Sequence, residues 1–279
     1  MIHRFCSQNG ISRVQSKVQL HKSTVIFLVL LLIFFYLLNL NLYTTIFTAI
    51  NSLRGHNPCQ GKTWIYSDVG WIDVSQVSGK SIDSVCLGKI WEPHVAQAIS
   101  RYLYGQGKAI DVGAFVGYHS IRMGKLTPNH KVYAIEGRES LHFNIERNVQ
   151  RNNINNVHVL DTPELINIEH GWNGNNLIKQ ILNDGDKAGV SLIKIDCEGC
   201  ELSFLIGVKE LIERDRPVII LEIQDDEKRS KEKIGGQKLH ASVGTRRDVI
   251  NYLENILKYE VSSLLEGSWD YEAVYMGEK

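Results

Sequence analysis

The densest group of acidic side chains in the sequence follows an apolar run that ends at Ile195. Asp196, Glu198 and Glu201 fall within six residues. Open parallel sheets bind ligands at the carboxyl ends of their strands, so a strand that ends here presents these carboxylates to a ligand. Glu201 also has a simpler interpretation, because an acid in the first turn of a helix complements the helix dipole. The pattern therefore predicts a ligand site with Asp196 and Glu198 as its leading members.

A second candidate site is a glycine-containing turn after the apolar run Lys108–Val112. Gly113 and Gly117 fall where a strand is expected to turn into a helix, and glycine lets a ligand approach the backbone without meeting a Cβ. The spacing is not the Gly-x-Gly-x-x-Gly of dinucleotide-binding folds. Asp111 precedes the first glycine by two residues, and its carboxylate suits a ligand with a cationic amine better than one with a pyrophosphate.

Glu136 is the third candidate. It directly follows the apolar run Val132–Ile135 and lies 19 residues after Gly117. An acid at about this distance, at the end of the second strand, accepts hydrogen bonds from a ribose in nucleotide-binding sheets. We expect Glu136 to bind a ribose diol, and an ordinary solvated loop carboxylate is the alternative.

The elements that must position these residues alternate regularly along the chain. Five apolar runs suit buried parallel strands: Lys108–Val112, Lys131–Ile135, Val157–Leu160, Leu192–Ile195 and Val218–Ile223. Helix-compatible segments are interspersed: Tyr118–Leu126, Ser140–Asn152, Asn175–Leu182, Glu201–Glu213 and Arg246–Leu257. This alternation predicts a parallel sheet covered by helices on both faces.

The two ends of this body have different patterns. Tyr259–Leu265 and Tyr271–Met276 are typical of two antiparallel strands around a turn. Before the first parallel strand, Trp91–Tyr104 has helical spacing and is followed by Gly105 and Gly107. Short strands are expected earlier still, at Trp64–Ile65, Trp71–Val74 and Ser84–Leu87. The fold class predicted is α/β, a mostly parallel sheet with a C-terminal antiparallel hairpin.

The candidate residues resemble the FkbM family of class I S-adenosylmethionine-dependent methyltransferases. The resemblance covers about Lys108 to Ile223 and rests on Asp111-x-Gly113-x-x-x-Gly117-Tyr118, Ile135-Glu136, Lys194-Ile195-Asp196-x-Glu198-Gly199-x-Glu201 and Glu222. It implies a Rossmann-like sheet of seven strands in the order 3-2-1-4-5-7-6, whose last two strands the hairpin supplies. It also implies O-methylation of sugars and related metabolites. One departure is Gly137, where members often have proline.

The resemblance further implies a role for each site residue. The cofactor S-adenosylmethionine would be held by these residues: Asp111, Gly113, Gly117, Tyr118, Glu136, Asp161 and Asp196. Asp111 and the glycine backbone would hold the methionine part, Glu136 the ribose hydroxyls, and Asp161 the region of the adenine, with a plain turn residue as the alternative for Asp161. Asp196 would lie beneath the sulfonium. Asp196 and Glu198 are the predicted catalytic residues, with Glu198 orienting the acceptor or serving as general base. No metal site is predicted.

The N-terminal fifth of the chain has a different character. Thr24 to Leu53 contains no charged side chain, and Val25–Leu38 is almost purely apolar. About 20 helical residues span a bilayer, so we predict a transmembrane signal anchor over residues 24–50; a buried core helix is the alternative. Four basic residues precede it within a tail at 1–23, and this bias keeps the N-terminus cytosolic. The methyltransferase domain (91–279), after a stem at 51–90, would then be lumenal in the ER or Golgi, or extracytoplasmic.

The cysteines leave one question open and suggest one assignment. An oxidising lumen could join Cys59 to Cys86, which spacing alone does not decide. Cys197 and Cys200 form a Cys-x-x-Cys pair, which we interpret as small core side chains. Two cysteines alone cannot complete a zinc site. A redox role is the less favoured alternative.

Charge limits the class of partner. The chain has 31 basic and 31 acidic residues, but residues 1–54 contain five of the basic and none of the acidic ones. The remainder is therefore acidic and lacks the positive field that nucleic-acid binding requires. The sequence thus predicts a membrane-anchored O-methyltransferase that acts on a hydroxyl of a small molecule, glycan or glycoconjugate, with no nucleic-acid partner. The alternatives are an NAD-dependent oxidoreductase and a non-catalytic, membrane-anchored binding module of the same fold.

Overall fold

The computed structural model describes most of the chain after residue 57. The described residues are Phe27, Leu30, Leu31, Ile33, Phe35, Tyr36, 58–75, 77, 80–160, 175–224, 233–234, 237–238 and 244–277. The chain divides into two units, Met1–His56 and Asn57–Lys279. Most of the predicted anchor at 24–50 and all of Asp161 lie outside the described residues. Within the described part, no helix has both the length and the apolar character needed to cross a bilayer.

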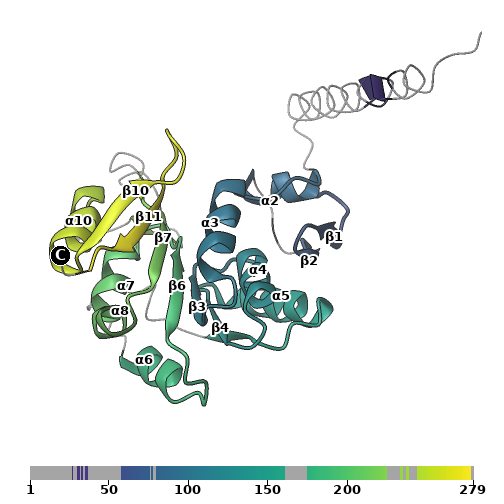
Figure 1. Cartoon of the computed structure of the whole chain (residues 1–279). Coiled ribbons are helices and arrows are strands. Elements are labelled where there is room, and N and C mark those ends of the chain that lie inside the picture. Colours follow the sequence, from purple (N-terminus) through teal and green to yellow (C-terminus); the bar gives the residue numbers. More distant parts are fainter. Residues whose placement is uncertain are drawn as a thin grey trace, which may run out of the picture. The chain divides into compact units, whose positions relative to one another are not determined.

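The second unit is built on a seven-stranded sheet (Figure 1). Its strands are β3 (Lys108–Val112), β4 (Val132–Ile135), β5 (Val157–Leu160), β6 (Val190–Ile195), β7 (Val218–Glu222), β10 (Tyr259–Ser263) and β11 (Asp270–Tyr275). They lie in the order β10-β11-β7-β6-β3-β4-β5, with β3 to β7 parallel and β11 antiparallel to both of its neighbours. Renumbered from β3, this is 3-2-1-4-5-7-6, so the predicted fold class is confirmed for the sheet and its C-terminal hairpin.

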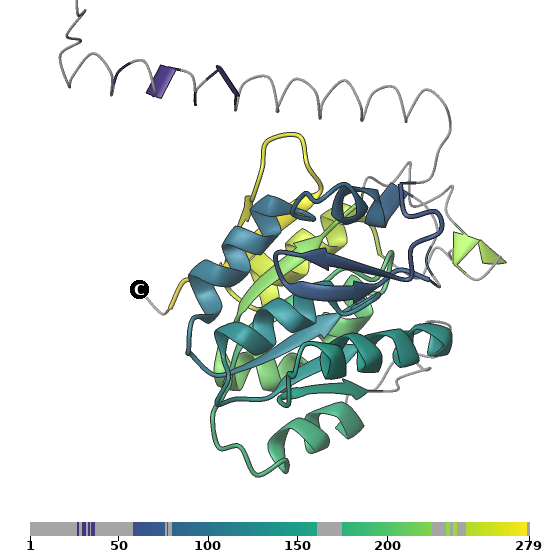
Figure 2. The same ribbon diagram turned by 90° about the vertical axis from the view of Figure 1, so that its right-hand side faces the viewer.

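Helices cover both faces of the sheet (Figure 2). One face packs against α3 (Pro93–Leu103), α4 (Tyr118–Leu126) and α5 (Glu139–Arg151). The other packs against α6 (Asn175–Leu182), α7 (Glu201–Gly207), α8 (Lys209–Asp215), α10 (Arg246–Asn251) and a π-helical turn at Tyr252–Ile256. Because successive strand residues point to opposite faces, Ala109 joins the first hydrophobic cluster and Ile110 the second. Both faces of the sheet are buried under helices, which explains why polar and apolar residues do not alternate along the strands.

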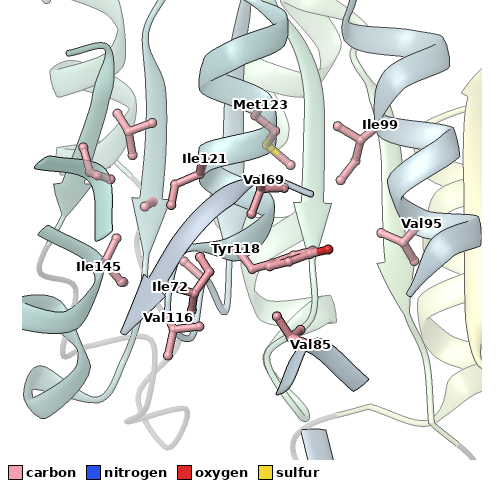
Figure 3. Close-up of a cluster of buried hydrophobic side chains, with 14 of the residues drawn as sticks. Val69, Ile72, Val85, Val95, Ile99, Val116, Tyr118, Ile121, Met123 and Ile145 are labelled. Carbon is pink, nitrogen blue, oxygen red and sulfur yellow. The ribbon is translucent and has the colours of Figure 1, made fainter. Parts of the chain in front are cut away.

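The residues before α3 pack into the first cluster. They form the antiparallel pair β1 (Trp64–Ser67) and β2 (Gly70–Asp73) and the helix α2 (Lys80–Cys86). Ile72 of β2 and Val85 of α2 are buried in the same cluster as side chains of α3, α4 and α5 (Figure 3). The amide of Asp73 also donates to Asn148 of α5. Cys59 and Cys86 form a disulfide, which answers the question that the sequence left open. Two strands of two residues each, β8 (Lys233–Ile234) and β9 (Gln237–Lys238), pair with each other and are not part of the main sheet.

Two expectations about local structure were wrong. Ser84–Leu87, predicted as a strand, lies mostly in α2, because the buried side chains Ile82, Val85 and Cys86 recur at helical spacing. The helix expected over Glu201–Glu213 is divided into α7 and α8 at Val208, whose φ of −111° is outside the helical range. The adjacent Gly207 has low helix propensity, which makes this the weakest point of the segment.

Candidate functional site

The ends of β3 and β6 meet so closely that only glycine fits between them. Gly113 has a φ of 75°, and a Cβ placed on it would lie 1.7 Å from the main-chain oxygen of Asp196. The amide of Asp196 donates to the carbonyl of Val112 at 2.9 Å. The glycine turn and the acidic segment, which lie more than 80 residues apart in the sequence, are thereby held together at the carboxyl edge of the sheet.

A buried lysine joins the two predicted acids. Lys194 is only 4% exposed, and its Nζ lies 3.4 Å from Asp196 Oδ2 and 3.7 Å from Asp111 Oδ1. Burial alone would lower the pKa of Lys194, but the negative charges of Asp196, Asp111 and Glu92 outweigh it and raise that pKa. Lys194 therefore stays charged, and the sequence motif supplies this cation together with the carboxylates around it.

Asp111 is fully buried and incompletely bonded. Its Oδ2 accepts a hydrogen bond from Ser120 Oγ at 2.5 Å, while its Oδ1 has no hydrogen-bond partner among the described residues. The Nζ of Lys194 lies 3.7 Å from this Oδ1, a separation longer than a hydrogen bond. A buried carboxylate oxygen left in this state favours an additional donor or cation nearby.

Glu222 and Asp270 extend the group of acids onto the next two strands. They face each other across the antiparallel pair of β7 and β11. Burial and the negative charge of Asp196, with further contributions that include Asp270, raise the pKa of Glu222 to about 9. Burial likewise raises the pKa of Asp270. Glu222 is thus protonated at neutral pH and hydrogen-bonds with Asp196.

We call Asp111, Asp196, Glu222 and Asp270 the acidic row, because they come from the neighbouring strands β3, β6, β7 and β11. Figure 1 shows these four strands side by side. The first three strands run parallel and end at this edge, whereas β11 runs the other way and begins there. One edge of the sheet therefore gathers acids from four segments of the chain.

The N-terminal end of α3 adds Glu92 and His94 to this edge. Glu92 precedes the helix with a left-handed φ of 44°, and its Oε2 lies 3.0 Å from His119 Nε2. Although burial would raise the pKa of Glu92, His119, Lys194 and His94 lower it. His94 Nε2 lies 2.6 Å from Asp270 Oδ2.

Glu136, the predicted ribose ligand, is bonded within the glycine turn. It is 5% exposed and accepts hydrogen bonds from the amides of Phe115 at 2.8 Å and Arg138 at 2.9 Å. The amides of Gly113 and Ala114 donate to the carbonyl of Ile135. The turn is thus fixed to the end of β4 by its own amides. Glu136 Oε1 also accepts from Arg138 Nε at 3.1 Å, so Glu136 retains one further lone pair, on Oε2, for a ligand hydroxyl.

Tyr118, a predicted cofactor residue, is held within the first cluster. Its side chain is fully buried in the first cluster (Figure 3), its hydroxyl donates to Asp68, and that hydroxyl accepts from the amide of Trp91 at 3.2 Å. Burial and the bond to Asp68 raise the pKa of Tyr118 to about 12. The Tyr118 side chain thus fixes α4 to the segments before it.

The loop after β6 also corrects the interpretation of its cysteines. Cys197 and Cys200 form a disulfide, so they are not separate core side chains. The bridge closes the loop that holds Glu198, which is exposed and has a left-handed φ of 55°. Glu201 is buried and accepts from the amide of Gly199 at 2.8 Å, so it shapes the loop in addition to starting α7. Strained non-glycine residues concentrate at functional sites, and Glu92, Phe115 and Glu198 all have positive φ at this edge.

Sequence reasoning missed Glu92, His94, His119 and Asp270. They come from the start of α3, from α4 and from the start of β11, and only packing and hairpin register bring them to the sheet edge. A signal existed for Glu92 alone, since it precedes a proline at the start of a helical pattern. Among the described residues, no group of three histidine, cysteine or acidic side chains is arranged to hold a metal ion.

Comparisons with known proteins found one family model and a set of similar solved structures. A family model described as the methyltransferase FkbM domain matches residues 177–259, which include Asp196, Glu198 and Glu222. Similar solved structures include precorrin-6y C5,15-methyltransferase from Geobacter metallireducens (17% identity, 66% of this chain and 88% of that chain covered, TM-score 0.41). Others are a SAM-dependent methyltransferase from Aquifex aeolicus (17%, 66% and 87%, TM-score 0.38) and Aeropyrum pernix fibrillarin with natively bound S-adenosyl-L-methionine (11%, 64% and 72%, TM-score 0.39). No curated protein matches significantly. The family match and the strand order support an S-adenosylmethionine-dependent methyltransferase.

Proposed function

We propose that this protein transfers a methyl group from S-adenosylmethionine to a hydroxyl group of its acceptor. The observation on which this mainly rests is the acidic row, which lies at the carboxyl edge of a sheet with the strand order 3-2-1-4-5-7-6. Ligands of open α/β sheets bind at that edge. The match of the FkbM domain to residues 177–259 supports the same activity.

The charges at this edge fit a cationic cofactor. Burial and the negative charge of Asp196 raise the pKa of Glu222. Asp196, Asp111 and Glu92 act on a single buried lysine, so negative charge is in excess. A ligand with a sulfonium and an ammonium group relieves that excess. Asp196, whose side chain is 22% exposed, would face the sulfonium, and Glu136 would bind the ribose hydroxyls beside the glycine turn. When bound, S-adenosylmethionine supplies an electrophilic methyl group.

A glycan or glycoconjugate in the secretory pathway is the acceptor class that we propose. The residues that resemble the FkbM family support a sugar hydroxyl, and the apolar run within residues 24–50 supports a signal anchor. Two disulfides, Cys59–Cys86 and Cys197–Cys200, fit an oxidising compartment on the far side of the membrane.

Binding and transfer test this proposal in turn. Isothermal titration calorimetry on the full-length protein should show binding of S-adenosylmethionine and none of NAD, and the reverse result would reject a methyltransferase in favour of an oxidoreductase. Transfer of a labelled methyl group to a panel of oligosaccharides should then occur with the wild type and fail with Asp196→Ala. Cofactor binding without transfer to any acceptor class would indicate a binding module of the same fold.

A further inference from the structure

One member of the acidic row, Asp270, is paired with a histidine that the cofactor site described above does not use. His94 Nε2 lies 2.6 Å from Asp270 Oδ2, and the two side chains are 19% and 16% exposed. His94 comes from the first turn of α3 and Asp270 is the first residue of β11, 176 residues later. An imidazole held by a carboxylate and still in contact with solvent is a common arrangement for a general base.

The pair lies at one end of the acidic row. Going along the sheet from the glycine turn, the row passes from β3 through β6 and β7 to β11, where Asp270 meets His94. The cofactor candidates Asp111, Gly113 and Glu136 belong to β3 and β4, on the other side of β6. If the cofactor binds there, with its sulfonium near Asp196, the part of the edge formed by β7 and β11 is open to the acceptor.

Three of the other acids at this edge are less suited to accept a proton. Glu222 is already protonated at neutral pH, since its pKa is raised to about 9 by burial and by Asp196. Asp196 is engaged by Lys194 and by Glu222, and Asp111 is fully buried. A histidine has an ordinary pKa near 6.5, which suits proton transfer at neutral pH.

We propose that His94 is the general base that deprotonates the acceptor hydroxyl, and that Asp270 is the positioning residue that holds its ring. This rests on the proposed methyltransferase function. The acceptor O–H proton passes to His94 Nδ1, because Nε2 is directed to Asp270. The oxygen lone pair forms the O–CH₃ bond as the S–CH₃ bond breaks, and that bonding pair remains on sulfur. The imidazolium then loses its proton to water.

An NMR titration of the histidine rings in the full-length protein tests whether His94 lies beside the reacting centre. Two samples are compared, one saturated with S-adenosylmethionine and one with S-adenosylhomocysteine, which lacks the methyl group and the sulfonium charge. The groups that face His94 are Asp270 on β11 and Glu92 on its own segment, with Asp196, Glu222, Lys194 and His119 beyond them. These groups are the same in both samples, so a difference in the midpoint comes from the methylated sulfonium. Its positive charge disfavours the imidazolium, and the titration midpoint of His94 should therefore be lower with S-adenosylmethionine by at least about half a pH unit.

His130 provides a matched internal control. Its Nδ1 lies 3.3 Å from Asp186 at the opposite edge of the sheet, and its midpoint should not differ between the samples. The His94→Gln variant assigns the resonance. Equal midpoints for His94 in both samples would overturn the inference while leaving the methyltransferase proposal intact. Absence of any S-adenosylmethionine binding would reject both.

Turnover supplies the second measurement, on any acceptor that the oligosaccharide panel identifies. His94→Ala should lower kcat at least about 100-fold, the usual range for a lost general base, while Kd for S-adenosylmethionine changes less than about threefold. Added imidazole should restore part of the activity of His94→Ala, and Asp270→Asn should lower kcat less. A His94→Ala enzyme with wild-type kcat would contradict the assignment, as would a loss of activity that follows loss of cofactor binding alone.

Discussion

The two edges of the parallel sheet each contain a buried lysine among carboxylates, yet the groups differ in how completely they are bonded. At the amino edge, Lys108 is 2% exposed and donates to Ile181 O at 2.7 Å and to Asp184 Oδ1 at 3.0 Å. Asp184 also accepts from the hydroxyl of Tyr133 and from the amide of Asp186. Although burial would raise the pKa of Asp184, its hydrogen bonds from Tyr133 and Lys108 lower it.

At the carboxyl edge the charged side chains are less completely hydrogen-bonded. Lys194 is 3.4 Å or more from each of its carboxylate partners, and Asp111 has one oxygen with no hydrogen bond among the described residues. The pKa values of Glu222 and Asp270 are raised, mainly because burial disfavours their charged forms. Lys108 and Lys194 thus lie on neighbouring strands of one sheet, but only Lys108 has a carboxylate partner at close hydrogen-bonding distance.

This contrast separates a structural ion pair from a binding site. A buried carboxylate with several donors and one close cation needs nothing more, so the group around Asp184 fixes the loop before β6. A group with more acids than cations is destabilising in isolation, and a cationic ligand reduces that penalty. The pocket at the amino edge, lined partly by His130, Lys131 and Asp184, has its acids already hydrogen-bonded and is the weaker candidate for a ligand site.

The largest effect that follows from the contrast is on stability at the amino edge. Lys108→Met should lower the free energy of unfolding by about 3–5 kcal/mol, because it leaves the buried Asp184 without its closest cation. Urea denaturation followed by circular dichroism measures this. Calorimetry at a temperature where the variant is folded should give an unchanged Kd for S-adenosylmethionine. A Kd weakened tenfold or more in a folded variant would show that the edges are coupled.

Much of this architecture could be predicted from the sequence. The bounds of β3, β5, α4 and α6 agree with the apolar runs and helical patterns, since each element is packed on a dry face that imposes a clear period. The motif likewise identified Asp111 and Asp196, whose strands are adjacent in any sheet of this order. Local sequence patterns were sufficient where the strand or helix that shows the hydrophobic pattern also contains the candidate site residue.

The remainder depends on contacts between distant segments. Asp270 reaches the site only through the register of β11 on β7, and His94 only because α3 packs on that side of the sheet. The bond between the Tyr118 hydroxyl and Asp68 likewise joins residues 50 positions apart in the chain. The Cys197–Cys200 bridge could not be read from spacing, because spacing does not fix the direction of the Cβ atoms.

The second prediction concerns cofactor affinity. Asp196→Asn should weaken binding of S-adenosylmethionine about 30-fold, or about 2 kcal/mol, because it removes a partly exposed negative charge facing the sulfonium. Binding of S-adenosylhomocysteine, whose sulfur is neutral, should weaken less. The matched variant at the amino edge, Asp184→Asn, should leave both dissociation constants unchanged, and calorimetry measures all four. Equal weakening for the two ligands would mean that Asp196 does not face the sulfur.

The third prediction is a pH dependence of stability. The pKa of Glu222 is about 9 in the folded protein against an ordinary 4.5, so between these values the folded state binds more protons than the unfolded state. Stability from this group is therefore present at low pH and falls as pH rises through that window, by at most about 1.4 kcal/mol per pH unit, and by less because Glu222 is partly exposed. Glu222→Gln should flatten the decline between pH 6 and 9 in urea denaturation. An unchanged slope would show that Glu222 is charged in the folded protein.

The smallest effect is the release of less than one proton per bound cofactor. A sulfonium near Asp196 lowers the pKa of the neighbouring Glu222, so binding of S-adenosylmethionine at pH 7.5 should expel part of the proton that these two acids share. Calorimetry in buffers of different ionisation enthalpy measures the number released. S-adenosylhomocysteine should release fewer protons, and Glu222→Gln should abolish the difference between the two ligands. Asp184→Asn should preserve that difference, since its carboxylate lies at the fully bonded edge, and a release independent of Glu222 would place the titrating group elsewhere.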